Sequence, residues 1–437
     1  MALEVIYERP LLTWRENLGE KSGGFIKDPI HGFVRLSLTE RSIIDTRPVQ
    51  RLKRIRQLAG SEFVYPAANH TRFEHVIGAM HLAGILCEAL PVGIARSQRE
   101  QLRLAALLHD IGHGPFSHVF EPLMEKHLGK THEDFVPWLI NKTEIADRLE
   151  AKGFDPETLG RLAIGKLSDK RRSFLDQVIS SGIDVDKMDY VVRDSFHTGA
   201  GYGSVDIHRL LYAMDIIEGS LAINRSAVAT LESFVLARFE SFRAIYFHKA
   251  SRAVQIMMVK ALETARDELG LLDFVKPDDY LRLDDYKVWT ALKESKRSGM
   301  IMQDLEARRL LKCAYERTVF TDEELLSRII SNERVRTDIE HEIAKKAKTA
   351  PEDVVIDTPS LPSVPYQGKA GLQSADIPIF TFSDGKKKRV SLSEVSRIVT
   401  ILHTFMRLVR VYTNETSRAR VESAARRILG EEPVSKD

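Results

Sequence analysis

A short apolar stretch that ends in an adjacent histidine and aspartate constrains this chain more than any other feature. Residues 105–118 read AALLHDIGHGPFSH, and the first half is apolar and helix-forming. Such residues lead a helix into the interior, where an ionised aspartate is rarely tolerated unless it is paired or binds a metal. Glycines and a proline follow His109 and Asp110 at once, so the helix ends there and both side chains can turn toward one ion. The segment predicts a buried polar site at the end of a core helix.

Composition limits the other classes of protein that this chain could belong to. The 437 residues are 43% hydrophobic and 29% charged, as in a globular chain with a substantial core. A net charge of +2 does not indicate general binding of nucleic acid or membranes, so any basic site must be local. The two cysteines, Cys87 and Cys313, support neither a disulfide framework nor a cysteine zinc site. Because the sequence shows no signal peptide and no apolar run of membrane length, we expect a cytoplasmic protein.

The spacing of apolar residues predicts a mainly α protein, with a helical core and a smaller α+β lobe at the C-terminal end. We expect three parts: an N-terminal arm at 1–24, a helical domain at 25–270 and the lobe at 271–437. One long helix is expected over about 227–269. Short strands are expected at 33–38, 354–356, 377–382 and 389–392, with a hairpin turn at Asp384-Gly385.

A second helix, expected at 49–59, has one apolar stripe and many basic or polar side chains. The latter are Gln50, Arg51, Lys53, Arg54 and Arg56. A run of this kind usually forms a solvated helix face, and a local anion site is the alternative.

Four candidate metal ligands stand at the ends of predicted segments. They are His75, His109, Asp110 and one carboxylate of the run IDVDKMD, in which Asp184, Asp186 and Asp189 remain alternatives. Two neutral imidazoles and two carboxylates suit one divalent ion per chain, with Mn, Fe, Co, Ni or Zn favoured and Mg less obvious. Four protein ligands leave room for water and a phosphate oxygen, so the set predicts a hydrolytic site.

An anionic substrate needs positive charge elsewhere, because a divalent cation with two carboxylates is neutral. The local supply consists of Arg72, His113, His118, His132, Lys187 and Arg238. Each has a plain structural alternative: Arg72 could be a surface residue of its helix, and His132 could cap the helix that begins at Glu133. Their joint occurrence favours an anion pocket.

Six ordered motifs resemble the HD-domain deoxynucleoside triphosphate triphosphohydrolases. They are KDPIHGFVRL, VQRLKRIRQL, TRFEHVIGAMHLA, LLHDIGHGPFSH, GIDVDKMDYVVRD and RAIYFHKA, and together they cover about residues 24–260. The later segments IDTPSLPS and DGKKKRVSLSEVS are similar to the C-terminal lobe of bacterial and archaeal members.

The resemblance implies roles for the matching positions. The metal ligands would be His75, His109, Asp110 and Asp186, where only the analogy selects Asp186. His118 and His132 would handle protons near the α-phosphate, and His113, Arg72 and Lys187 would contact phosphates. Gln57, Leu58, Tyr190, Asp194 and Tyr246 would surround the sugar and exclude a ribose 2′-hydroxyl, with Arg238 on nearly the same helix face as Tyr246.

The implied reaction is metal-dependent attack of water on the α-phosphorus of a deoxynucleoside triphosphate, which releases deoxynucleoside and triphosphate. Family members commonly form homodimers or homotetramers. Some vertebrate-type members bind an activating guanine nucleotide, and Asp45 and Gln50 match that pocket. Lys53 stands where an Arg is usual and Gly24 where a Lys is expected, and because Lys lacks the guanidinium fork these departures count against activation by GTP.

Two other hypotheses follow from the same residues. Another HD phosphohydrolase, such as a phosphodiesterase or nucleotidase, could hold two metals and use His113, His118 and His132 as extra ligands. A catalytically silent nucleotide-binding regulator is the second alternative, although the complete ligand set argues against it.

Overall fold

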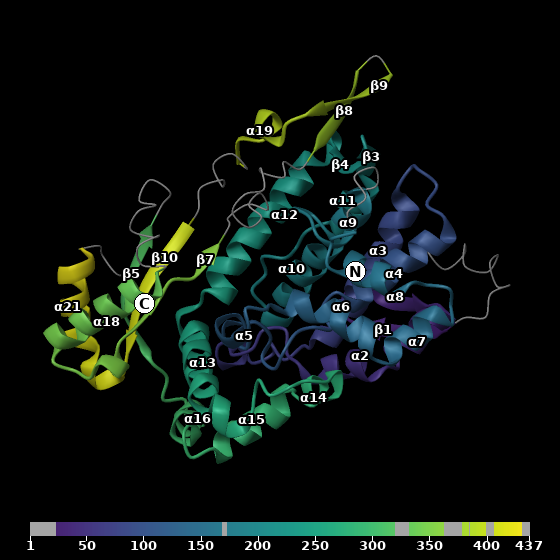
Figure 1. Cartoon of the computed structure of the whole chain (residues 1–437). Helices are drawn as coiled ribbons and strands as arrows, with labels where there is room; N and C mark the ends of the chain where they lie inside the picture. Colours follow the sequence, from purple (N-terminus) through teal and green to yellow (C-terminus); the bar gives the residue numbers. More distant parts are fainter. Residues whose placement is uncertain are drawn as a thin grey trace, which may run out of the picture.

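The computed structural model describes residues 23–167, 173–319, 332–361, 378–383, 385–398 and 406–430. The protein is mainly α, as the sequence predicts (Figure 1). The helices are α1 Leu38–Ile44, α2 Arg47–Arg51, α3 Arg72–Ala89, α4 Arg96–Leu108, α5 Glu121–Leu128, α6 His132–Lys142, α7 Glu144–Glu150, α8 Pro156–Ala163, α9 Ser173–Ile179, α10 Val185–Thr198, α11 Ile207–Tyr212, α12 Val228–Ser241, α13 Lys249–Leu269, α14 Pro277–Leu281, α15 Asp285–Glu294, α16 Gly299–Glu306, α18 Glu333–Ala347, α19 Leu392–Val395 and α21 Arg418–Leu429.

Short strands form three small sheets. The strands are β1 Gly24–Asp28, β2 Gly32–Leu36, β3 Met214–Ile217, β4 Ser220–Asn224, β5 Lys312–Val319, β6 Val355–Asp357, β7 Ser360–Leu361, β8 Ile379–Ser383, β9 Lys386–Val390 and β10 Met406–Thr413. β1 and β2 form an antiparallel hairpin, and β5, β10 and β6 form a second sheet in which β7 also pairs with β10. The third sheet has the order β3-β4-β8-β9, and its β4 and β8 run parallel.

Helix α3 is the centre of the helical part, packed between α4 and α10. Its apolar residues surround the whole helix, and Val76, Met80 and Leu82 are fully buried, as expected for a core helix. Capping boxes fix where helices begin: Thr71 and Glu74 close the first turn of α3, as Thr131 and Asp134 do for α6. These caps set which side chains each helix presents at its end.

The described residues form two main apolar cores. The larger joins the helices from α1 to α16, including Leu271 and Tyr280, which follow the boundary predicted at 270 and 271. The smaller lies between the sheet around β10 and the helices α18 and α21, at the far left in Figure 1. The domain boundary itself stays a prediction.

Two helix predictions are wrong in detail. The expected helix at 227–269 is interrupted, because a π-helical turn, Phe242–Tyr246, ends α12 and His248 caps the new helix α13. The expected helix at 49–59 ends early: α2 stops at Arg51 and a single 3-10 turn, Leu52–Arg54, follows. Its basic residues do not form one solvated face, since Arg51 is only 1% exposed.

The predicted strands correspond to β2, β6, β8 and β9 with shifted ends, and Leu392 begins α19 instead of ending a strand. Most of the predicted N-terminal arm, at 1–22, and Asp384 of the predicted hairpin turn lie outside the described residues. No helix among the described residues combines the length and apolarity needed to cross a membrane.

Candidate active site

Four predicted ligands come together where α3, α4 and α10 meet. His75 lies on the first turns of α3, His109 caps the end of α4, Asp110 follows it, and Asp186 is in the first turn of α10. His75 Nε2 is 3.1 Å from Asp186 Oδ1 and 3.3 Å from His109 Nε2. His109 Nε2 is 3.4 Å from Asp110 Oδ1 and 3.6 Å from Asp186 Oδ1. Three helices therefore bring two imidazoles and two carboxylates to one point.

In both histidines, the nitrogen that points away from the carboxylates, Nδ1, contacts a hydrogen-bond acceptor. His75 Nδ1 is 2.8 Å from Asp189 Oδ2, and His109 Nδ1 is 2.8 Å from the carbonyl oxygen of Ala106. An acceptor at Nδ1 favours the tautomer that carries its proton there, which leaves the Nε2 lone pair for a metal. Both Nε2 atoms face the carboxylates, so the donor set fits a divalent cation.

The electrostatic field at this point favours positive charge. Burial lowers the pKa of His75, but hydrogen bonds with Asp186 and Asp189 outweigh it and raise the pKa to about 10. Burial raises the pKa of Asp110, but Arg72 and the neighbouring imidazoles hold that pKa well below its usual value. The site therefore keeps its carboxylate ionised although it is buried.

The three acids of the IDVDKMD run have different surroundings. Asp184 caps α10, accepting from the backbone N–H groups of Lys187 at 2.8 Å and Ser181 at 2.7 Å. Asp189 lies behind His75. Only Asp186 faces both imidazoles, so the geometry favours the carboxylate that the resemblance selects.

Asp189 belongs to a buried network that the sequence analysis missed. Arg193 donates to both of its oxygens at 2.8 Å, and its Nη1 reaches Asp28 Oδ2 at 2.9 Å. His31, held in the β1–β2 turn, places Nε2 2.6 Å from Asp189 Oδ1. The hairpin and α10 thus fix the carboxylate that orients His75.

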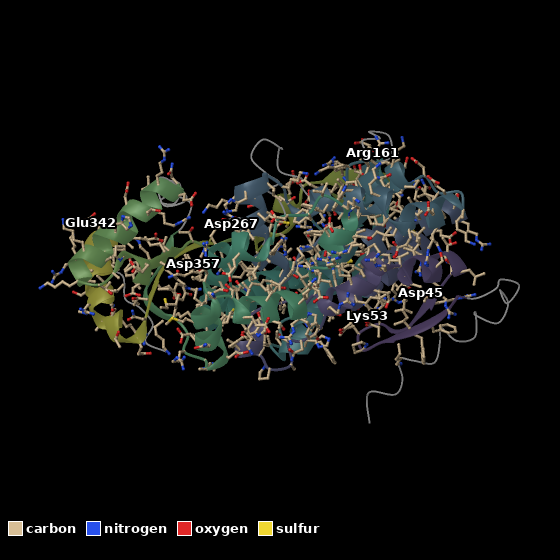
Figure 2. All side chains as sticks on the ribbon, turned by 60° about the horizontal axis from the view of Figure 1, so that its bottom comes forward. Asp45, Lys53, Arg161, Asp267, Glu342 and Asp357 are labelled. Carbon is tan, nitrogen blue, oxygen red and sulfur yellow. The ribbon has the colours of Figure 1, made fainter. Side chains whose placement is uncertain are left out.

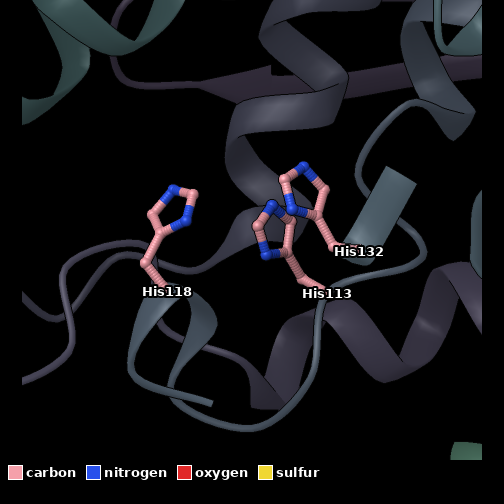
Figure 3. A group of neighbouring side chains, drawn as sticks. All are labelled: His113, His118 and His132. Atoms are coloured by element: carbon pink, nitrogen blue, oxygen red, sulfur yellow. The ribbon is translucent and has the colours of Figure 1, made fainter. Parts of the chain in front are cut away.

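A second histidine group consists of His113, His118 and His132 (Figure 3). It lies beside the first, since His113 Nε2 is 3.3 Å from Asp110 Oδ1. The rings of His113 and His132 are stacked, with centroids 3.8 Å apart and planes 16° from parallel. Glu121 joins the other two: its Oε1 is 2.5 Å from His132 Nδ1 and its Oε2 is 2.9 Å from His118 Nδ1. Burial raises the pKa of Glu121, but the contacts with the two histidines outweigh it and hold the pKa well below its usual value.

The stacking bears on whether these histidines could share a second metal. Their candidate ligand atoms lie within 4.8 Å of one another. A metal binds an imidazole nitrogen close to the ring plane, at about 2.1 Å. One ion cannot lie in both of two nearly parallel planes at the observed separation, so His113 and His132 as they lie favour contact with an anion or proton transfer.

Buried donors without partners point to an anion beside the ligands. Arg72 uses Nη1 on Asp110 Oδ2 at 2.5 Å and Nε on Ser117 Oγ at 2.6 Å. Among the described residues nothing receives its Nη2, and the same holds for Nε and Nη1 of Arg238. Such atoms are rarely left unsatisfied in a folded protein without a ligand or water to receive them.

The residues predicted to surround a sugar lie next to these donors. Tyr246 donates to Asp194 Oδ2, and His70 Nε2 is 2.8 Å from Asp194 Oδ1. Lys187, Tyr190 and Asp194 occupy one face of α10, and Lys187 Nζ donates to Asp184 Oδ2 at 2.6 Å. Arg238 lies close to Tyr190.

Gln57 and Leu58 belong to the same neighbourhood through the chain. Gln57 donates its backbone N–H to the carbonyl oxygen of His70 at 3.1 Å, and its Oε1 is buried without a partner among the described residues. Leu58 is half-buried beside it. Contacts thus connect the predicted site residues other than Leu58 to one region, and Leu58 follows Gln57 in the chain.

At the predicted effector pocket, Asp45 and Lys53 lie on the surface (Figure 2), whereas Gln50 is half-buried. Asp45 follows α1 and its side chain is 61% exposed. Gln50 is engaged internally: its Nε2 donates to the carbonyl oxygen of Ile44, and its Oε1 accepts from Lys53 Nζ, both at 2.8 Å. Lys53, which stands where the family resemblance leads us to expect an Arg, thus contacts Gln50 of the predicted effector pocket.

Two family matches cover most of the chain: the HD domain at residues 72–194 and the HD associated region at residues 205–436. An uncharacterised Bacillus subtilis protein is 30% identical over 69% of this chain and 73% of its own length. The deoxynucleoside triphosphate triphosphohydrolase SAMHD1 of Homo sapiens is 32% identical over 62% of this chain, which spans about half, 48%, of that relative.

Similarity to a solved structure extends over nearly the whole chain. A phosphohydrolase from Bacteroides thetaiotaomicron superimposes with a TM-score of 0.70 at 26% identity, covering 90% of this chain and all of that one. The fold agrees with the resemblance seen in the motifs. The chain therefore belongs to the family of HD-domain phosphohydrolases that includes the deoxynucleoside triphosphate triphosphohydrolases.

Proposed function

We propose that this protein hydrolyses deoxynucleoside triphosphates to deoxynucleoside and triphosphate. The observation that carries the proposal is the convergence of His75, His109, Asp110 and Asp186 beside buried guanidinium N–H groups of Arg72 and Arg238 that no described residue accepts. A cation-binding centre next to an anion pocket suits a metal-dependent phosphohydrolase acting on a polyphosphate.

These four residues would hold one divalent ion per chain, of the set Mn, Fe, Co, Ni, Zn or Mg. When bound, such an ion lowers the pKa of water and polarises a phosphate oxygen. The engaged Nδ1 atoms of both histidines support this assignment, since they leave the two Nε2 atoms free for the ion.

The chain's own residues supply the remaining chemistry. Arg72 Nη2, Arg238 and Lys187 provide positive charge for the phosphates, and His113, whose Nε2 lies 3.3 Å from Asp110 Oδ1, would contact them through its ring. Water adds to the α-phosphorus and releases a proton to solvent, the bond from phosphorus to the 5′-oxygen breaks, and that oxygen takes a proton from His118 or His132. Glu121 contacts Nδ1 of both His118 and His132, so the Nε2 atom of each ring points away from Glu121 and could transfer the proton.

The sugar would lie against Tyr246, Asp194 and Tyr190, with Gln57 and Leu58 beside them. The bond between Tyr246 and Asp194 fixes both polar groups in place. A wall at this point would exclude a ribose 2′-hydroxyl, so ribonucleotides would be rejected.

Assembly and effector binding are part of the same proposal. We expect a homodimer or homotetramer, with any nucleotide effector bound near Asp45 and Gln50. Light scattering with and without GTP would show whether assembly depends on that nucleotide.

Product analysis tests the function directly. The purified chain is incubated with dNTPs, NTPs, dNMPs and cyclic dinucleotides and with each divalent metal in turn. We expect equal amounts of deoxynucleoside and triphosphate from dNTPs only. Asp110→Ala should lose both bound metal and turnover, whereas Asp267→Ala, at an exposed position on α13 (Figure 2), should keep both. Release of pyrophosphate, of inorganic phosphate, or of nothing from dNTPs would contradict the proposal.

A further inference from the structure

The loop that carries His113 and His118 has an unusual backbone. Phe116 and Ser117 have φ angles of 60° and 55°, so two consecutive non-glycine residues lie in the left-handed region. L-residues rarely adopt this conformation unless the surrounding structure holds it, and such strain often lies at functional sites. Something must hold this turn in place.

Asp285 supplies that hold from a distant part of the chain. Its Oδ1 accepts the backbone N–H of Phe116 at 2.6 Å, and its Oδ2 accepts the backbone N–H of Arg56 at 2.9 Å. The side chain is almost completely buried. The preceding residue, Asp284, caps helix α15 by accepting the N–H of Lys287 at 3.0 Å, so the carboxylate of Asp285 is free to reach the loop.

This left-handed turn also positions the guanidinium group of Arg72, through the side chain of Ser117. The hydroxyl of Ser117 accepts from Arg72 Nε and donates to the carbonyl oxygen of Arg56, both at 2.6 Å. Asp285 and Ser117 thus bind the two ends of the same Arg56 residue. This closed ring of contacts sets the direction of the Arg72 guanidinium, whose Nη2 remains available to an anion.

Two further buried side chains hold the start of the loop. Arg51 Nη1 donates to the carbonyl oxygen of His113 at 2.8 Å, while its Nε donates to that of Leu283 at 2.7 Å. The hydroxyl of Tyr280 donates to the carbonyl oxygen of Gly112 at 2.7 Å. The segment around α14 and α15 therefore lies directly behind the loop that presents the histidines.

We infer that Asp285 is a positioning residue: its carboxylate holds the left-handed turn at Phe116 and Ser117, and so places Arg72 and His118 for the reaction. The role rests on the proposed function. It assigns to the region after the HD domain a direct part in building the site, since the matched domain ends at residue 194.

The substitution Asp285→Asn tests this role, because an amide has one oxygen and its nitrogen cannot accept the second N–H group. We expect kcat to fall by about 10- to 100-fold, as small misplacements of catalytic groups do, with a smaller change in KM and the same metal content per chain. Asp284→Asn is the matched control: its amide oxygen can still cap α15, it weakens only the ion pair with Arg54, and it leaves the turn, so its kcat should stay near that of the wild type.

A double-mutant cycle separates positioning from general weakening of the fold. Ser117→Ala removes the hydroxyl through which Asp285 acts on Arg72. If both residues belong to one chain of contacts, the effects of the two substitutions on kcat should not be additive. The kcat of the double variant should then lie no more than about 3-fold below that of the less active single variant. Independent losses that multiply would overturn the inference, as would a wild-type kcat in Asp285→Asn.

Two safeguards keep the outcome interpretable. If Asp285→Asn does not fold, judged by its melting temperature and metal content, Asp285→Glu keeps the charge, displaces the oxygens and gives the same comparison. A wild-type chain without dNTP hydrolysis would contradict the proposed function, whereas an active wild type with an equally active Asp285→Asn would contradict only the role of Asp285.

Discussion

Asp189 and His75 form a buried pair in which Asp189 Oδ2 lies 2.8 Å from Nδ1 of the imidazole. The opposite nitrogen of the same ring, Nε2, is 3.1 Å from Asp186 Oδ1. The two acids are three residues apart on α10 and so lie on one face of it. A single turn of α10 therefore provides both the candidate ligand Asp186 and the carboxylate of Asp189, which orients the candidate ligand His75.

Asp189→Asn should weaken metal binding without removing a ligand. Loss of the charge that orients a ligating histidine typically costs about 10- to 100-fold in affinity. Metal titration by calorimetry measures the change. Asp184→Asn, which alters a cap of the same helix, is the control and should change affinity much less; equal losses in both variants would contradict the orienting role.

Gly78→Ala should destabilise the protein through the same network. A Cβ at Gly78 would lie 1.9 Å from Asp189 Oδ1 and 2.4 Å from Arg193 Nη2, and both side chains are buried. Overpacking of this kind costs about 1–3 kcal/mol. Urea unfolding measures the loss, and Gly93→Ala, where no atom lies within 4 Å of the added methyl, should stay within about 0.5 kcal/mol of the wild type.

Glu121→Gln should lower kcat while bound metal stays constant. A glutamine has one acceptor oxygen, so it can hold only one of the two Nδ1–H groups that Glu121 faces. Because proton transfer by a positioned side chain contributes about 100-fold or more, we expect a loss of at least about 10-fold. Glu125→Gln, an exposed change on the same helix, should leave kcat unchanged; an unaffected Glu121→Gln enzyme would show that neither ring needs this carboxylate.

The free energy of unfolding should decrease as pH rises, because Asp285 loses its proton in the folded protein. Burial raises the pKa of Asp285 to about 6, although hydrogen bonds from Phe116 and Arg56 oppose it. Between pH 4 and pH 6 the folded state thus binds a proton that the unfolded chain has released, so stability declines as pH rises toward and past 6. A shift of about two units corresponds to about 3 kcal/mol.

Urea unfolding at several pH values isolates this effect. Asp285→Asn cannot titrate, so the wild type should lose stability relative to the variant between pH 4 and pH 6. Parallel stability curves over that interval would show that the Asp285 pKa is not raised.

The sequence predicts the candidate metal ligands better than the residues that hold the site in place. His109 and Asp110 are evident because an apolar helix leads to them and glycines follow. Selection of Asp186 needed a family analogy, because alternate spacing in IDVDKMD does not show that Asp184 caps the helix. The site roles themselves remain predictions until metal and activity are measured.

The missed residues share a physical cause. Arg51 lies in a basic run that predicts exposure, and only the fold shows that it is buried against Tyr280 and the His113 carbonyl. Glu121 contacts His118 at a spacing that is ordinary on any helix start, and its contact with His132 depends on how α5 and α6 pack. Asp285 lies 169 residues from Phe116 and 229 from Arg56 along the chain. Contacts of this kind leave no local pattern.

The pairing of β4 with β8 has a consequence for how the protein is made. Ile223 pairs with Ile379, which a ribosome adds only after every element from α12 to β7 has been synthesised. Until then one edge of β4 offers open backbone groups to any passing strand. Newly made chains are thus most vulnerable to aggregation midway through synthesis, and the late β8–β9 hairpin closes that edge.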